Sequence, residues 1–243
     1  MSWLAGLRRP PPPEHTAVEP PPPERHAAPG LAQALAWLEG KPHRILDLGT
    51  PLHANVARLS RLAPKLAVAD LAGALQDGLP ALAAIEEAFS ILPPGGLAEP
   101  FQLVLAWDLP NHLGRDLLHR LGERLAPRCA EGCLVHALLD VGKTMPALPR
   151  RYRIRDDDSV EQDCLTAEEL PCPRLQPGEL DRLLPGFAVE KSRLLTHGVQ
   201  EVLLTRTDKA EIPITRQAPI RRELRKTLPR GRQGLPDPQD SRS

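Results

Sequence analysis

The segment from Arg44 to Leu62 constrains the fold of this chain more than any other. A short apolar run that is interrupted by Asp47 ends at Gly49, and leucine and valine then recur at spacings of three and four. The first pattern predicts a buried strand, and the second predicts an amphipathic helix. A strand that enters a helix through a glycine turn is typical of the opening unit of a nucleotide-binding α/β sheet.

The alternation of strand and helix patterns continues between residues 31 and 207. We expect helices over 31–38, 51–62, 79–89, 117–121 and 178–184, and strands over 44–48, 66–68, 101–108, 187–195 and 200–205. Residues 89–92 predict a short third strand, and residues 142–177 predict an irregular insert. His197 and Gly198, between the last two strands, predict a hairpin turn.

Both ends of the chain are poor in the residues that form a core. Residues 1–30 contain two runs of four prolines, which predict a polyproline II head. Residues 208–243 contain a basic run at 216–232, in which seven basic residues and one acid give a net charge of +6. We therefore expect a disordered head over 1–30, one domain over 31–207 and a disordered basic tail over 208–243.

The basic run at 216–232 is a local feature, because the formal net charge of the whole chain is zero. It fits a negatively charged partner, either an acidic protein or a nucleic acid. No aromatic residue lies between its arginines to stack on a base, and a solvated tail that binds nothing is the alternative.

Membrane and metal-binding classes are disfavoured by the sequence. No run approaches the roughly 18 apolar residues of a membrane span, and no signal peptide is visible, so we expect a cytoplasmic protein with no membrane contact. The four cysteines, at positions 129, 133, 164 and 172, lack the C-x₂-C spacing of a zinc ribbon. We expect reduced thiols that pack in the domain, and no metal site.

The glycine turn resembles the first motif of the class I S-adenosylmethionine-dependent methyltransferases, in which an acid in the strand precedes three spaced glycines. Asp47 and Gly49 match that motif, whereas Pro51 and His53 replace the other two glycines. Proline has a fixed φ and no N–H, so it cannot take the role of a loop glycine. Thr50 and Pro51 instead predict a helix start, with Thr50 as the N-cap and Pro51 at the first helical position.

Two further segments carry the resemblance. Residues 101–108 resemble the fourth strand of the family, and residues 125–135 resemble its turn into the fifth strand. An antiparallel terminal hairpin is also the ending of the family. The resemblance implies a Rossmann-like, doubly wound and mainly parallel sheet with an antiparallel terminal hairpin, and S-adenosylmethionine as the cofactor.

The cofactor-binding candidates are Asp47, Gly49, Asp70 and Trp107, and the resemblance implies the first three of them. Asp70 follows Asp47 by 23 positions, close to the roughly 20 expected between a glycine turn and a ribose-binding acid. Its alternative role is to cap the helix after the second strand. Trp107 could stack beside the adenine or the methyl acceptor, and ordinary packing is its alternative.

Asp108, Asn111 and His112 are the catalytic candidates, because they follow the strand at 101–108 at the edge where open α/β sheets bind ligands. A base is needed only where the acceptor must lose a proton. Asp108 could instead cap the next helix, and His112 could lie on its solvated face.

Two functions remain open on these residues. The first is a methyltransferase with an atypical glycine loop and an unknown acceptor. The second is a non-catalytic scaffold of the same fold, which binds a protein or nucleic acid through its tails or its charged insert. That insert sets four arginines between 150 and 155 against three aspartates at 156–158, and could form a lid or pair its charges internally.

Overall fold

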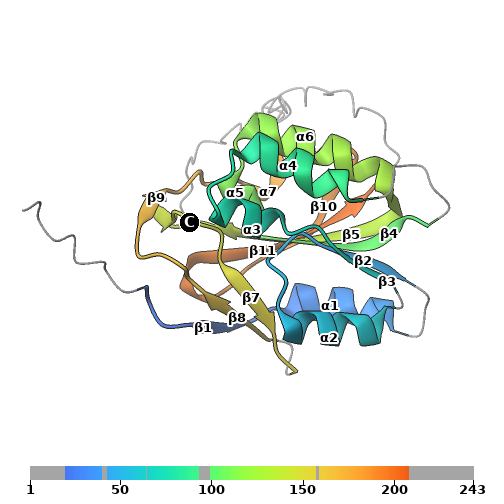
Figure 1. Cartoon of the computed structure of the whole chain (residues 1–243), viewed down its shortest axis with the longest axis horizontal. Helices are drawn as coiled ribbons and strands as arrows, with labels where there is room; N and C mark the ends of the chain where they lie inside the picture. Colours follow the sequence, from blue (N-terminus) through green and yellow to red (C-terminus); the bar gives the residue numbers. More distant parts are fainter. Residues whose placement is uncertain (1–19, 40–42, 64, 93–98, 157–158, 208–243) are drawn as a thin grey trace, which may run out of the picture. The chain divides into compact units, whose positions relative to one another are not determined.

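In the computed structural model, the described residues are 20–39, 43–63, 65–92, 99–156 and 159–207. The basic run at 216–232 and most of the predicted head lie outside them. A six-stranded sheet forms the centre, in the order β10-β11-β5-β4-β2-β3 (Figure 1). Its strands are β2 (Arg44–Asp47), β3 (Lys65–Val68), β4 (Phe101–Trp107), β5 (Cys129–Asp140), β10 (Phe187–Leu194) and β11 (Val199–Arg206).

The sheet is parallel over four strands and antiparallel over the last two. β2 pairs in parallel with β3 and with β4, and β4 pairs in parallel with β5. β11 pairs antiparallel with both β5 and β10. The predicted Rossmann-like, doubly wound sheet with an antiparallel terminal hairpin is therefore confirmed.

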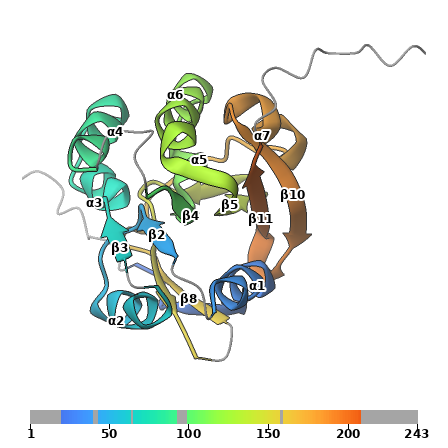
Figure 2. The same ribbon diagram turned by 90° about the vertical axis from the view of Figure 1, so that its right-hand side faces the viewer.

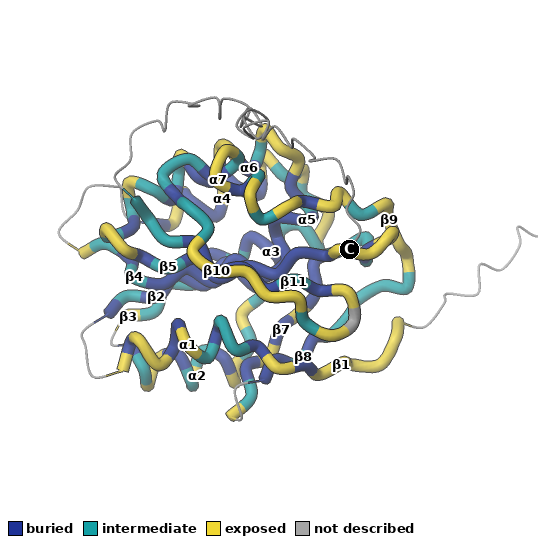
Figure 3. The backbone as a smooth tube through the Cα atoms, turned by 180° about the vertical axis from the view of Figure 1, so that it is seen from behind, coloured by how far each residue is buried: buried dark blue, intermediate teal, exposed yellow. Residues whose placement is uncertain are grey.

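Helices cover both faces of the sheet, as the end-on view in Figure 2 shows. One face carries α3 (Leu71–Gln76), α4 (Ala81–Ser90), α5 (Leu109–His112), α6 (Arg115–Leu125), the 3₁₀ turn η1 (Ala126–Arg128) and α7 (Pro177–Leu183). The other face carries α1 (Pro29–Leu38) and α2 (His53–Leu62). Each layer packs on its own apolar cluster, built mainly from leucine and alanine, and the middle strands are the most buried backbone (Figure 3).

None of the described helices combines the length and the apolar character that a membrane crossing requires. All four cysteines are free thiols, and Cys129 and Cys133 are buried in the core cluster under the α4 and α6 layer. The described residues hold no cluster of three or more histidine, cysteine or acidic side chains that could bind a metal.

The helix after β2 starts later than the sequence predicts. Leu52 is the N-cap and is still extended, with φ −106° and ψ 131°, so α2 begins only at His53. No side chain caps this helix, and the prediction of Thr50 as N-cap with Pro51 at the first position is wrong. Thr50 instead donates a hydrogen bond from Oγ1 to Oε1 of Gln76, over 3.1 Å.

The predicted short strand at 89–92 is also wrong. Phe89 belongs to α4, where it lies one turn from Ile85, and both side chains are buried in the core. Among the described residues no strand lies between β3 and β4, so β3 forms the edge of the sheet.

The insert at 142–177 is built from strands, which corrects the prediction of an irregular region. It contains β6 (Thr144–Pro146), β7 (Arg151–Ile154), β8 (Ser159–Asp163) and β9 (Glu169–Pro171). β6 pairs with β9, and β8 pairs with β7 on one side and with β1 (Glu24–Ala27) on the other. β1 falls within the stretch predicted as a disordered head, so the domain begins before the predicted boundary at residue 31.

Charges of the insert pair both with other parts of the domain and within the insert itself. Asp156 binds Arg58 of α2 at 2.5 Å, and Arg153 binds Glu161 of β8 at 2.5 Å. Arg150 binds acids of the central sheet, as described below. Residues 157 and 158 lie outside the described residues.

Asn55 joins α2 to the outer edge of β7. Its Nδ2 donates to the carbonyl oxygen of Tyr152 at 2.6 Å, and its Oδ1 accepts from the N–H of Ile154 at 2.9 Å. Among the described residues β7 has no strand on this side, and the buried side chain of Asn55 supplies the hydrogen bonds that a neighbouring strand would make.

Replacing Asn55 with alanine should lower the free energy of unfolding by about 2–4 kcal/mol, because two buried backbone groups lose their partners. Urea denaturation measures this change. Ser60→Ala, at an exposed position of the same helix, is the control and should change stability by less than about 0.5 kcal/mol. Equal stability of the two variants would contradict the bridging role.

Candidate functional site

The carboxyl ends of β2 and β4 form the switch point of the sheet. The two strands are neighbours, but the chain leaves β2 toward α2 on one face and leaves β4 toward α5 and α6 on the other. Open α/β sheets bind ligands at such a point. The predicted residues Asp47, Gly49, Trp107 and Asp108 all lie here.

Asp47 ends β2 and is almost fully buried. Its Oδ1 accepts hydrogen bonds from the N–H of Gly49 at 2.9 Å and from Nε1 of Trp107 at 2.7 Å. Burial raises the pKa of Asp47 to about 6, although these two hydrogen bonds oppose the shift. The carboxyl group therefore shapes the glycine turn and holds the indole.

Trp107 covers the turn that the sequence offers to a cofactor. A side chain on Gly49 would begin 2.5 Å from Nε1 of Trp107, so the indole lies against the bare backbone of that glycine. The ring stacks on Tyr152 of β7, with centroids 5.1 Å apart and planes 5° apart. Trp107 also has φ 50°, a region disfavoured by about 1–2 kcal/mol, so these contacts must hold it.

Asp70 adopts the role of a helix cap. Its Oδ1 accepts from the N–H of Gly73 at 2.9 Å, at the start of α3, and its own φ is 37°. Burial raises the pKa of Asp70, although the hydrogen bond opposes this. The carboxylate is thus turned onto the helix, which is the alternative that the sequence left open.

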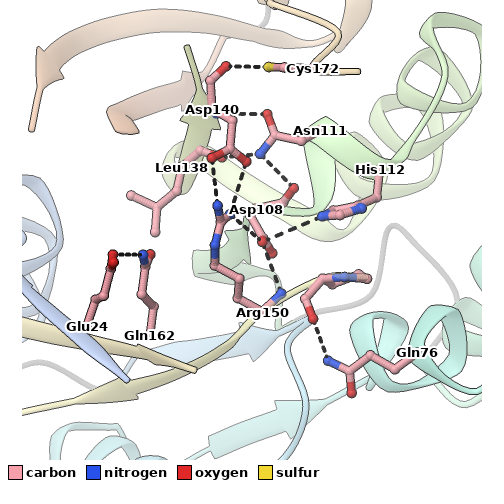
Figure 4. Close-up of polar contacts among 11 residues, drawn as sticks. Glu24, Gln76, Asp108, Asn111, His112, Leu138, Asp140, Arg150, Gln162 and Cys172 are labelled. Carbon is pink, nitrogen blue, oxygen red and sulfur yellow. Dashed lines mark hydrogen bonds and ion pairs between the residues drawn. The ribbon is translucent and has the colours of Figure 1, made fainter. Parts of the chain in front are cut away.

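Asp108 and Asp140 share one buried arginine of the insert (Figure 4). Asp108 accepts at Oδ2 from the backbone N–H and from Nη1 of Arg150, both at 3.1 Å. Asp140 accepts from Nη1 and Nη2 of Arg150 at 3.0 and 2.8 Å. The expectation that Asp108 caps the following helix is wrong, because no side-chain cap forms there.

Asn111 and His112 belong to the same network. Asn111 donates from Nδ2 to the carbonyl oxygens of Asp108 and Leu138, and accepts at Oδ1 from the N–H of Asp140. His112 has Nε2 3.6 Å from Oδ2 of Asp108, and only 5% of its side chain is exposed. His112 is therefore not on a solvated helix face, and the three catalytic candidates form one buried cluster.

With His112 neutral, the cluster has more negative than positive charge. Burial raises the pKa of Asp108, but the hydrogen bond and charge of His112, with the charge of Arg150, outweigh it and lower the pKa overall. Two carboxylates then share one guanidinium group, which leaves one negative charge when His112 is neutral.

Sequence reasoning missed Asp140 and Arg150. The signal for Asp140 was present, because it ends an apolar strand in the same way as Asp47 and Asp108. No sequence pattern distinguishes Arg150 from the other arginines of the insert. Only the fold places it between the two acids.

Replacing Arg150 with glutamine should lower the free energy of unfolding at pH 7 by about 3–5 kcal/mol, because two buried carboxylates lose their counter-ion. The variant should regain part of this lost stability near pH 5, because the unpaired carboxyl groups take up protons there. Denaturant titrations at both pH values measure it. Arg151→Gln, which removes the next and exposed arginine, should be nearly neutral.

Asp47→Asn tests the raised pKa, because asparagine keeps an acceptor for Gly49 and Trp107. The folded wild-type protein binds a proton at Asp47 more readily than the unfolded chain does, so this group makes the protein less stable as the pH rises from about 4 to about 6. Stability of the variant relative to wild type should rise by about 3 kcal/mol over that window. A pH-independent difference would contradict the shift.

No protein-family model matches the sequence. No curated protein matches it either. Among solved structures, it is similar to SAM-bound CalS10, an amino pentose methyltransferase from Micromonospora echinaspora (16% identity, 74% of this chain and 89% of that chain, TM-score 0.42).

Two further similar structures carry methyltransferase names. One is the 1,6-didemethyltoxoflavin-N1-methyltransferase of Burkholderia thailandensis with S-adenosylhomocysteine (17% identity, 72% of this chain and 77% of that chain, TM-score 0.41). The other is a putative type 11 methyltransferase from Sulfolobus solfataricus (17% identity, 76% of this chain and 96% of that chain, TM-score 0.40). The likeness is low in each case, and the doubly wound architecture of this chain rests on its own strand order.

Proposed function

We propose that the chain is a divergent class I S-adenosylmethionine-dependent methyltransferase-like protein whose cofactor site is closed in this conformation. The observation that carries the proposal is that Asp47, Gly49 and Trp107 meet at the switch point between β2 and β4. An acid with a pKa near 6 at that point is typical of a functional site.

Asp47, Gly49, Asp70 and Trp107 are the residues that would hold the cofactor, which would supply a methyl group on a sulfonium. In this conformation they do not fit it. The indole of Trp107 covers Gly49, and the carboxylate of Asp70 faces Gly73. Binding therefore requires that the stack of Trp107 and Tyr152 opens, with Tyr152 and β7 acting as the lid.

An opening step lowers the apparent affinity, because only the open fraction of the protein can bind. Removing the ring of Tyr152 should raise that fraction. In calorimetric titrations with S-adenosylhomocysteine, Tyr152→Ala should bind about tenfold more tightly than wild type, and Tyr152→Phe should bind like wild type because the ring stack remains. Tyr152→Leu is a second variant that keeps apolar volume if the alanine variant fails to fold.

Asp47→Ala in the Tyr152→Leu background should abolish this binding while circular dichroism remains that of a folded domain. If neither wild type nor the folded Tyr152 variants bind S-adenosylhomocysteine at millimolar concentration, the cofactor proposal is wrong.

A second candidate is the non-catalytic scaffold, and a specific pocket favours it. Five arginines line a pocket of about 510 Å³ between β1, α2 and β7, namely Arg25, Arg58, Arg61, Arg153 and Arg155. Asp156 is its only acidic lining residue within the described chain. Guanidinium groups pair well with phosphates, so the partner of this arginine pocket would be a nucleic-acid backbone.

The ion pairs of the arginine pocket do not prevent binding. Asp156 is fully exposed beside Arg58, and Arg153 is about half exposed in its pair with Glu161. Such surface pairs contribute less than about 1 kcal/mol, so a phosphate can compete for the arginines.

Fluorescence anisotropy with a labelled single-stranded RNA tests this candidate on the full chain. Arg58→Gln with Arg61→Gln should weaken binding about tenfold and reduce the salt slope by about 1.4, the effect of two lost phosphate contacts. Arg115→Gln with Arg120→Gln on α6 removes the same charge from the opposite face and is the control. Equal losses in both, or no binding by wild type, would reject the candidate.

A further inference from the structure

A second pocket, of about 350 Å³, lies at the carboxyl end of β5 and is separate from the arginine pocket. Its walls come from residues 21–24, from β6 and β9, and from β8, and Asp140 and Arg150 line it as well. Glu24 and Gln162, which Figure 4 shows hydrogen-bonded to each other, line the same pocket as Arg150. Its volume is in the range of about 300–1,000 Å³ that small-molecule sites occupy.

The lining of this pocket is acidic. Four carboxylates line it, from Glu24, Asp140, Glu168 and Glu169, and Arg150 is its only basic lining residue within the described chain. Arg150 carries one positive charge, and two carboxylates, those of Asp140 and Asp108, already share it. No ion pair with a lysine or arginine is formed by Glu24, Glu168 or Glu169 among the described residues.

Gln162 provides an independent sign of a missing partner. Only 4% of this residue is exposed, and its Nε2 donates to Oε2 of Glu24 at 3.0 Å. That bond fixes the orientation of the amide, since only its nitrogen can donate to a carboxylate. Oε1 then has no hydrogen-bond donor among the described residues. A buried acceptor without a donor costs about 1–3 kcal/mol, so it calls for a partner.

We infer that this pocket binds an organic ammonium group, which donates to Oε1 of Gln162 and is held by the surrounding carboxylates. An ammonium group supplies three donors and a positive charge, so it satisfies the amide oxygen and the excess negative charge together. Arg150 Nε also lacks a hydrogen-bond partner among the described residues, so a hydroxyl or carbonyl oxygen near the ammonium group would complete the fit. The site does not depend on cofactor binding.

The same chemistry has two sources, a free amine and a lysine side chain of another protein. Calorimetric titration of the full chain with putrescine and with Nα-acetyl-lysine amide, at constant ionic strength, distinguishes them. Saturable binding of either probe is expected and identifies the source. Nα-acetyl-norleucine amide, which lacks the ammonium group, should not bind.

Two exposed glutamates allow a test that does not disturb the core. Glu168→Gln with Glu169→Gln should weaken binding of the ammonium probe about tenfold. Glu39→Gln with Glu131→Gln changes the net charge equally at exposed positions outside the pocket and should change the affinity less than twofold. Gln162→Leu, which removes the buried acceptor, should abolish binding in a protein that remains folded.

Absence of saturable binding by both probes at millimolar concentration would overturn the inference. Equal weakening by the two double variants would also overturn it, because the probe would then respond only to the overall charge of the protein.

Discussion

The sharing of Arg150 between Asp108 and Asp140 is the interaction on which the arrangement of this domain depends. Asp140 ends β5 and Asp108 directly follows the neighbouring strand β4, whereas the arginine lies in the insert, directly before β7. Without it, two carboxylates would face each other in a medium of low dielectric constant. The ion pairs of Arg150 therefore attach the insert to the sheet. The hydrogen bonds of Asn55 and the stacking of Tyr152 on Trp107 then fix the position of β7.

The same attachment explains why the edge at which open α/β sheets bind ligands is covered in this structure. Once Arg150 is anchored, β7 runs across the carboxyl ends of β2 and β4, and Tyr152 falls on the indole of Trp107. The indole in turn satisfies the buried acid of β2. The carboxylate of Asp47 and the N–H of Gly49, which in an open sheet would face a ligand, are thus hydrogen-bonded within the chain. A ligand at this edge has to compete with contacts that the protein already makes.

Most of the fold could be predicted, because strand and helix patterns in this chain are local. The apolar runs of β2, β4 and β5 and the terminal hairpin follow from periodicity and turn residues. The short strand over 89–92 is predicted wrongly because a short apolar run fits a strand as well as a buried helix end. The insert was missed because one of its three strand pairings lies outside it: β8 pairs with β1, and nothing in residues 142–177 encodes that partner. Of the site, the acids at strand ends were predictable, whereas the function of Arg150 was not, because a buried arginine has no local pattern.

The pairing of β1 with β8 sets an order for the folding of the chain during synthesis. Glu24 and Gln162 are 138 positions apart, so at about 5–20 residues per second the ribosome needs roughly 7–28 s to supply the partner of the first strand. Throughout that time the edge of β1 has no strand to pair with. The proline runs before it, and the charges of Glu24 and Arg25, suit such a delay, because prolines and charged side chains hinder the pairing of an exposed edge with other chains. β1, the first strand among the described residues, is therefore made early but is among the last strands that can be incorporated.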